Sequence, residues 1–153
     1  LINKDSKNSD YYKANAREYK QQLAALDKKY RRLLTRCKSD MILHAGHWAF
    51  AYLAKRYNLK YKAAYSTSAE AEPLPQNIFE MAEQVRQMNT PYIFYEGLIA
   101  PRLAQTIARE TGAGLLKLNN GHDIGKDDMK KGVTFISLME DNLNNLKTGL
   151  SCP

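Results

Sequence analysis

Long apolar runs, cysteine-rich spacing and internal repeats are all missing from this chain of 153 residues. No stretch approaches about 18 uninterrupted apolar residues, and the first five residues lack the basic and apolar segments of a signal peptide, so the sequence predicts no membrane-spanning helix. GxSxG and CxxC motifs are absent as well, which leaves nucleophilic and dithiol catalysis unsupported. Because the chain begins at Leu1 rather than Met, we interpret it as a processed or excised piece of a longer protein.

The composition is that of one globular domain, with 44% hydrophobic and 25% charged residues. Its net charge of +7 is uneven, because residues 1–62 hold 15 Lys and Arg against 5 Asp and Glu, whereas residues 63–153 hold 8 against 11. Such a basic arm is either a nucleic-acid footprint or the solvated face of a long helix. We favour the solvated face and expect no nucleic-acid partner, since the sequence shows no aromatic and arginine pattern of an RNA-binding module.

A long amphipathic helix is predicted near the N-terminal end. Gly and Pro are missing from residues 9–37, and apolar side chains recur there at steps of three and four residues. These side chains are Tyr12, Ala16, Tyr19, Leu23, Leu26, Tyr30, Leu33 and Cys37. About 28 residues at a rise of 1.5 Å form a rod of roughly 40 Å, longer than a compact domain of this size needs. The helix is therefore expected to lie along more than one body or to pair as a coiled coil.

The rest of the chain alternates between short apolar strands and helices. Strands are expected at residues 40–44, 61–65, 92–95 and 115–118. Helices are expected at residues 47–57, 75–89 and 101–111, with a last one from 127 or 133 to 147. Four strands with helical crossovers predict an α/β fold, in which a three-layer lobe with a four-stranded parallel sheet follows the long N-terminal helix.

Polar residues follow each predicted strand, at the edge where ligands bind to open parallel sheets. The segments are residues 46–47, 66–70, 96–97 and 119–123. His47, Glu96 and His122 lie in them, whereas His44 lies within an apolar strand and is expected in the core. Imidazole and carboxylate groups on one rim suit either a metal site or an enzyme that uses His47 and Glu96 as an acid/base pair.

Plainer interpretations of the same residues remain open at this point. His47 alternatively packs locally at the start of a helix, His122 lies on a surface loop, and Glu96 ends its strand in solvent. Cys37 and Cys152 are 115 positions apart. They form a disulfide in an oxidising compartment or stay free thiols in a reducing one.

Residues 47–57, HWAFAYLAKRY, resemble the HxAFxYLAxxY segment of the metal-binding solute-binding proteins of ABC importers, the zinc and manganese uptake family. Weaker matches occur at residues 72–73, 93–96, 104–110 and 135–143, and the resemblance covers residues 9–152. Members of that family have two α/β lobes joined by one long helix, with the metal between the lobes. The resemblance implies that residues 1–39 are the connecting helix and residues 40–153 the C-terminal metal-binding lobe, with the N-terminal lobe absent.

The resemblance also implies a ligand set. The histidine that the family's C-terminal lobe contributes falls on His47, and a further ligand falls between the last strand and the last helix, on His122 or Asp123, of which we favour His122. Glu96 resembles a carboxylate of the cleft wall that orients a ligand. Because imidazole suits zinc and carboxylate-rich sites suit manganese, the expected ion is zinc, with manganese as the alternative.

The implied function is binding without catalysis: capture of the metal ion and its delivery to a membrane ABC permease. The implied location is extracytoplasmic, either periplasmic or lipid-anchored at the cell surface. Family members of the zinc type often carry a disulfide in this lobe, which favours a Cys37–Cys152 bond. A homodimer through the exposed helix is a further expectation, because that helix has lost its covering lobe.

Overall fold

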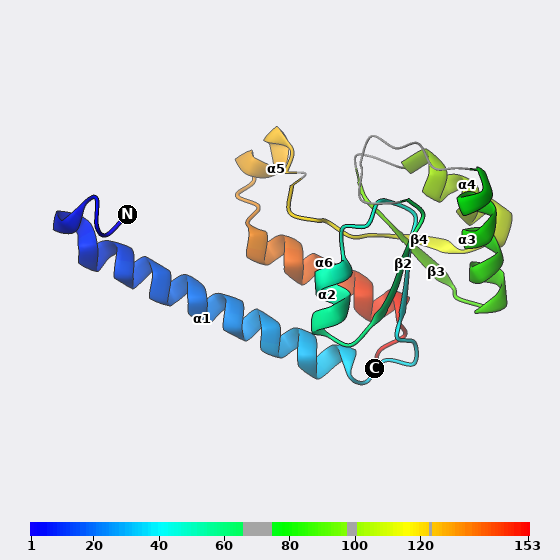
Figure 1. Cartoon of the computed structure of the whole chain (residues 1–153), viewed down its shortest axis with the longest axis horizontal. Coiled ribbons are helices and arrows are strands. Elements are labelled where there is room, and N and C mark those ends of the chain that lie inside the picture. Colours follow the sequence, from blue (N-terminus) through cyan, green and yellow to red (C-terminus); the bar gives the residue numbers. More distant parts are fainter. Residues whose placement is uncertain (66–74, 98–100, 123) are drawn as a thin grey trace.

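The computed structural model describes residues 1–65, 75–97, 101–122 and 124–153. A short 3₁₀ turn, Ser6–Asn8, leads into the long helix α1, Ser9–Leu34, and an α/β lobe follows (Figure 1). Strands and helices alternate from α1 to β4 in the order that the sequence predicts, and two helices rather than the one predicted follow β4. No helix among these residues is both long enough and apolar enough to cross a membrane.

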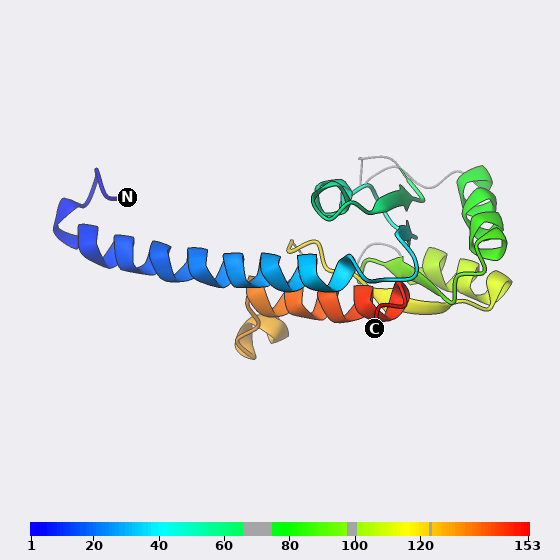
Figure 2. The same cartoon turned by 90° about the horizontal axis from the view of Figure 1, so that it is seen from below.

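The C-terminal part of α1 anchors it to the described part of the lobe. Leu26, Tyr30 and Leu34 are buried there, one helical turn apart, so the apolar stripe meets the core at this end. The first half of the helix projects beyond the lobe in both views (Figures 1 and 2) and leaves Tyr11 and Tyr19 exposed. The length of α1 therefore exceeds what this lobe covers, as the sequence predicts.

Four parallel strands form one sheet in the order β2-β1-β3-β4. They are β1 (Met41–His44), β2 (Lys60–Ala63), β3 (Tyr92–Tyr95) and β4 (Gly114–Lys117). The register pairs Ile42 with Tyr61 and Phe94 with Leu116. The predicted four-stranded parallel sheet is confirmed, and its carboxyl ends share one edge.

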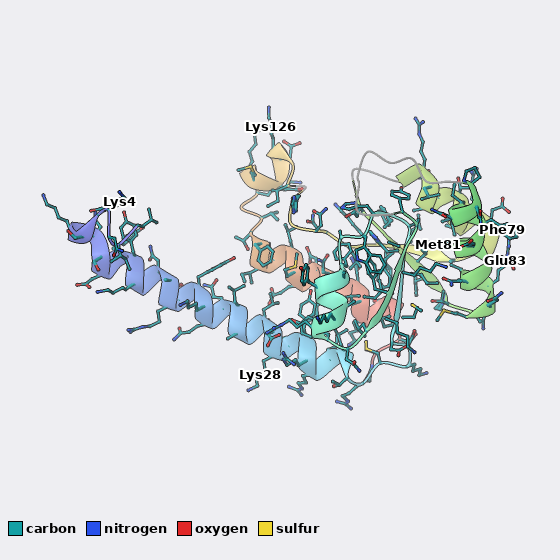
Figure 3. All side chains as sticks on the ribbon, in the orientation of Figure 1. Lys4, Lys28, Phe79, Met81, Glu83 and Lys126 are labelled. Carbon is teal, nitrogen blue, oxygen red and sulfur yellow. A yellow bond between two sulfur atoms is a disulfide. The ribbon has the colours of Figure 1, made fainter. Side chains whose placement is uncertain are left out.

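Helices cover both faces of the sheet, which completes the predicted three layers. α3 (Pro75–Gln87) and α4 (Pro101–Thr111) pack on one face, over Leu43 and Ile93. Figure 3 shows Met81 on the side of α3 that faces the sheet, with Phe79 and Glu83 on the opposite side. Met81 is fully buried and Phe79 is exposed, as these directions require.

The other face is covered by α1, by α2 (Ala51–Arg56) and by α6 (Phe135–Gly149), which pack over Ile42, Phe94 and Leu118. The short helix α5 (Lys126–Lys130) buries no residue. α6 begins at a capping box, in which the Thr134 side chain accepts from the Ser137 backbone and Ser137 Oγ accepts from Thr134 N.

A disulfide joins the ends of the two long helices. α1 and α6 lie side by side and run in the same direction (Figure 2), and the chain segments that follow them are linked by the Cys37–Cys152 bond. Backbone hydrogen bonds from Ser39 N to Leu150 O and from Lys38 N to Ser151 O hold the same junction. The expected disulfide is confirmed, and it fixes α1 to the lobe at one end only.

The expected helix start at His47 is wrong. α2 begins at Ala51, and the preceding residues form turns in which the His47 carbonyl accepts from Ala49 N at 2.8 Å and from the Tyr61 hydroxyl at 2.9 Å. In a helix that carbonyl would accept from Ala51 N instead. His47 therefore belongs to a turn beyond the end of β1.

A charged cluster ties α1 to α2. Asp27 accepts hydrogen bonds from Arg56 Nε at 2.8 Å, from the Tyr57 hydroxyl at 2.9 Å and from Arg31 Nε at 3.0 Å. The hydrogen bond from Arg56, with smaller contributions from Arg31 and Tyr57, holds the pKa of the Asp27 carboxyl far below its usual value of 3.8. The ionised carboxylate is thus favoured by the folded state.

We predict that Asp27→Asn lowers the free energy of unfolding at pH 7 by about 1 kcal/mol, the upper end for a partly exposed ion pair. Since the pKa of Asp27 is depressed on folding, its contribution is complete above pH 3.8 and is lost as the pH falls toward the folded-state value. Urea unfolding of both proteins between pH 7 and pH 2 measures the difference, which should shrink below pH 4. Asp10→Asn, which removes a partner of exposed Lys13 alone, is the control and should change stability little. Equal effects of the two substitutions would contradict the assignment.

Candidate metal site

The predicted site residues gather at the carboxyl-terminal edge of the sheet. β1 ends at His44 and leads to His47, β3 ends directly before Glu96, and β4 leads to the loop that carries His122. Because neighbouring parallel strands end at the same edge, these three loops adjoin one another. The predicted segment at residues 66–70 and the alternative ligand Asp123 lie outside the described residues.

His47 and Glu96 form the closest polar contact of this edge. His47 Nδ1 lies 2.5 Å from Glu96 Oε2, and the Glu96 side chain is 1% exposed whereas that of His47 is 16% exposed. A carboxylate on Nδ1 fixes the orientation of the ring and leaves Nε2 to bind a metal ion, as in many zinc sites. Among the described residues, Nε2 of His47 makes no hydrogen bond. The ring is therefore held by one nitrogen and presents the other.

Asn120 links this pair to the loop of His122. Its Nδ2 donates to Glu96 Oε1 at 3.1 Å, and its Oδ1 accepts from the His122 backbone N at 2.8 Å. Gly121, between them, adopts a φ of +85°, a conformation that favours glycine. A continuous series of polar contacts thus runs from the His47 ring through Glu96 and Asn120 to the backbone of His122.

Hydrogen bonds from α6 hold the same loop in place. Asn142 is buried, and its amide group both accepts from Asn119 N and donates to Asn119 O, each at 2.7 Å. These two hydrogen bonds continue the pattern of a strand beyond the end of β4. Asn119 in turn accepts from Gly121 N at 2.7 Å, so the path of the loop to His122 is set by hydrogen bonds at successive residues.

His44 is a core residue, as predicted. Its ring is fully buried, with the edge of Phe50 at a centroid distance of 5.0 Å, and burial lowers the pKa of His44 to about 3. His44 Nδ1 lies 3.2 Å from both the His47 carbonyl and the Tyr61 hydroxyl. The imidazole is therefore neutral at physiological pH and faces the main chain of His47.

Two imidazole rings at this edge, among the residues that the structure describes, have exposed surface. His47 is partly exposed and His122 is exposed, so both can reach a ligand outside the lobe. Among the described residues, no group of three or more His, Cys, Asp or Glu side chains could hold a metal ion. A complete zinc site, which has three or four protein ligands, requires groups in addition to these described side chains.

Comparison with known proteins decides the family. The sequence model of the family described as zinc-uptake complex component A, periplasmic (ZnuA), matches residues 1–149. The chain belongs to this family. The resemblance drawn from residues 47–57 is thereby confirmed.

Relatives and solved structures agree with this assignment. The high-affinity zinc uptake system protein ZnuA of Bacillus subtilis is 31% identical over 150 residues, 98% of this chain and 47% of that protein. The zinc-binding lipoprotein AdcA of Streptococcus pneumoniae is 35% identical over 150 residues, 94% of this chain and 30% of that protein. The Zn(II)-bound ZnuA-like domain of pneumococcal AdcA superposes with a TM-score of 0.80 at 33% identity, covering 98% of this chain and 56% of that one. The chain thus spans half or less of the length of these curated relatives.

The alternative prediction of an acid/base enzyme gains no support from these comparisons. The relatives are named for metal binding and metal uptake, and none of these names describes a catalyst.

Three residues of this edge were not singled out by sequence reasoning. Asn142 interrupts an apolar stripe, four residues from both Leu138 and Leu146, and a polar residue at such a position was the available signal. Asn120 was named only as part of a polar loop. Tyr61 gave no signal, because a tyrosine in a strand is ordinary.

We predict that Asn142→Ala lowers the free energy of unfolding by about 3 kcal/mol, since it leaves the buried N–H and C=O of Asn119 without partners. Hydrogen exchange of the amides of residues 119–122 should also become faster than in the unmodified chain. Asn145→Ala, which removes one exposed hydrogen bond to the Lys117 carbonyl, is the matched control and should cost about 1 kcal/mol or less. Equal losses in the two variants would show that Asn142 does not clamp the loop.

Proposed function

We propose that this chain is the C-terminal half of an extracytoplasmic zinc-binding protein that captures the ion and delivers it to an ABC permease. The contact of His47 Nδ1 with the buried Glu96 carboxylate carries the proposal, since it is the arrangement that prepares an imidazole for a metal ion. The names of the relatives support the same function: ZnuA of Bacillus subtilis is a zinc uptake protein and AdcA of Streptococcus pneumoniae a zinc-binding lipoprotein.

The proposed ligands from this half are His47 and His122. The series of contacts through Glu96 and Asn120 supports their cooperation, because it joins the two loops that carry them. Neutral imidazole nitrogen is a preferred ligand of zinc, whereas manganese prefers carboxylate and water oxygen, so we propose zinc as the ion and manganese as the weaker alternative.

The remaining ligands are proposed to come from an N-terminal lobe that this chain does not contain. Residues 1–39 would then be the helix that connects the lobes and residues 40–153 the C-terminal lobe. The projecting first half of α1 (Figure 2) supports this division, because its Tyr11 and Tyr19 are exposed. A homodimer that covers the same helix stays a separate prediction.

The location proposed for this chain is periplasmic or lipid-anchored. The Cys37–Cys152 disulfide supports it, since such bonds persist in oxidising compartments and are rare in the cytosol. The family description names the periplasm, and the pneumococcal relative is a lipoprotein.

Calorimetric titration of the chain with zinc tests the proposed function. We expect one zinc ion per chain, bound more weakly than by a four-ligand site because water completes the coordination shell. His47→Ala and His122→Ala should each weaken binding by about tenfold or more, and manganese should bind less tightly than zinc. Asp10→Asn, in the first turn of α1, is the control and should bind zinc like the unmodified chain. Absence of binding, or tight binding that survives both histidine substitutions, would overturn the proposal.

A further inference from the structure

His44 is a buried histidine that metal binding does not use directly. Its ring is fully buried at the end of β1, three residues before His47, and it is held between the edge of Phe50 and the ring of Tyr61. A leucine or phenylalanine would fill this volume without the need to bury polar nitrogen atoms, which is costly unless they form hydrogen bonds. We therefore expect the role of the imidazole to lie in its polar contacts.

His44 Nδ1 and the Tyr61 hydroxyl both meet the carbonyl oxygen of His47, and they lie 3.2 Å from each other. His44 Nδ1 lies 3.2 Å from this oxygen, and the Tyr61 hydroxyl donates to the same oxygen at 2.9 Å. A carbonyl oxygen can only accept, so the contact assigns the ring proton of His44 to Nδ1. Two side-chain donors, one from β1 and one from β2, thus hold the main chain at the residue that presents its ring to the metal.

Gly46 makes this approach possible. A Cβ atom at position 46 would lie 2.5 Å from Cε1 of His44, closer than real Cβ atoms come, and 3.2 Å from Oε2 of Glu96, a tight contact that a small shift of the carboxylate would have to relieve. The His44 ring and the Glu96 carboxylate thus close on the backbone of Gly46 from two directions. Side chains contact His47 at two places. Glu96 contacts its ring, and His44 and Tyr61 contact its carbonyl oxygen.

We propose that His44 and Tyr61 are positioning residues for the metal ligand His47, acting through its backbone carbonyl. The inference rests on the proposed function. The His47 ring has two side-chain dihedrals between its main chain and its Nε2, so the direction of Nε2 is defined only if the main chain and the ring are both held. His47 lies in a turn rather than in a helix, and these two side-chain donors join Ala49 N at the carbonyl that a helical hydrogen bond would otherwise occupy.

The test compares substitutions that keep the shape with substitutions that keep the donor. His44→Phe fills the same volume without a donor, whereas His44→Asn places an amide N–H near the position of Nδ1. Tyr61→Phe removes only the second donor. Tyr57→Phe is the matched control, because it removes a partly buried tyrosine hydroxyl that donates to Asp27, away from the site.

Zinc affinity and the NMR signal of the His47 imidazole nitrogens are measured for each variant. We expect His44→Phe to weaken zinc binding by about tenfold, the loss typical of groups that orient a ligand, and Tyr61→Phe to weaken it by a smaller factor. His44→Asn should restore most of the affinity that His44→Phe loses. Tyr57→Phe should lower stability and leave zinc affinity unchanged.

The NMR signal separates this inference from the proposed function. In the metal-free chain, the single sharp Nδ1–H signal of His47 should broaden or split in His44→Phe and return in His44→Asn. If the unmodified chain binds no zinc while this pattern appears, the proposed function fails and the positioning role stands. If zinc binds and both the affinity and the His47 signal are the same in His44→Phe as in the unmodified chain, the positioning role is wrong.

Discussion

The carboxylate of Glu96 is the constraint around which the edge of the sheet is built. Its side chain is 1% exposed, and a carboxylate removed from water needs partners, because an unpaired buried charge costs several kcal/mol. One oxygen contacts the His47 ring and the other accepts from Asn120. Burial of this one charge therefore fixes groups from two loops, which follow different strands.

The parallel sheet brings these loops together, and α6 holds one of them by hydrogen bonds. β1, β3 and β4 are neighbours and run parallel, so the chain emerges from each at the same edge. Asn142 on α6 secures the loop after β4, and the Cys37–Cys152 bond secures α6 against the end of α1. The edge that carries the proposed ligands is thus connected through α6 to the long helix, whose far half lies beyond the lobe (Figures 1 and 2).

Much of this architecture follows from sequence patterns. The alternation of apolar strands and helices predicts the parallel sheet, because long-range pairing of four short apolar strands with helical crossovers has few alternatives. Proline at positions 75 and 101 predicts the first residues of α3 and α4, since proline is favoured in the first turn. The start of α2 was predicted four residues too early, because side-chain donors to the His47 carbonyl have no signature in the sequence.

The candidate site was predictable in kind but not in its supporting contacts. His47, Glu96 and His122 could be selected because each follows a strand and carries a group that binds metals or orients ligands. Asn120 and Asn142 could not be assigned a role, because the role of an asparagine depends on its hydrogen-bond partner, which is known only from the fold. His44 was correctly expected in the core, and its contact with the His47 carbonyl became visible only when the turn was known.

X-ray absorption spectroscopy of the zinc-loaded chain tests the central claim that this half offers two imidazole ligands. The account predicts a zinc shell with two imidazole nitrogen atoms at about 2.0 Å, completed by water oxygen, and one imidazole in His47→Ala. The chain has three histidines, and His44 is buried with its Nδ1 directed to the main chain. A shell without imidazole, or a shell with three, would contradict the account.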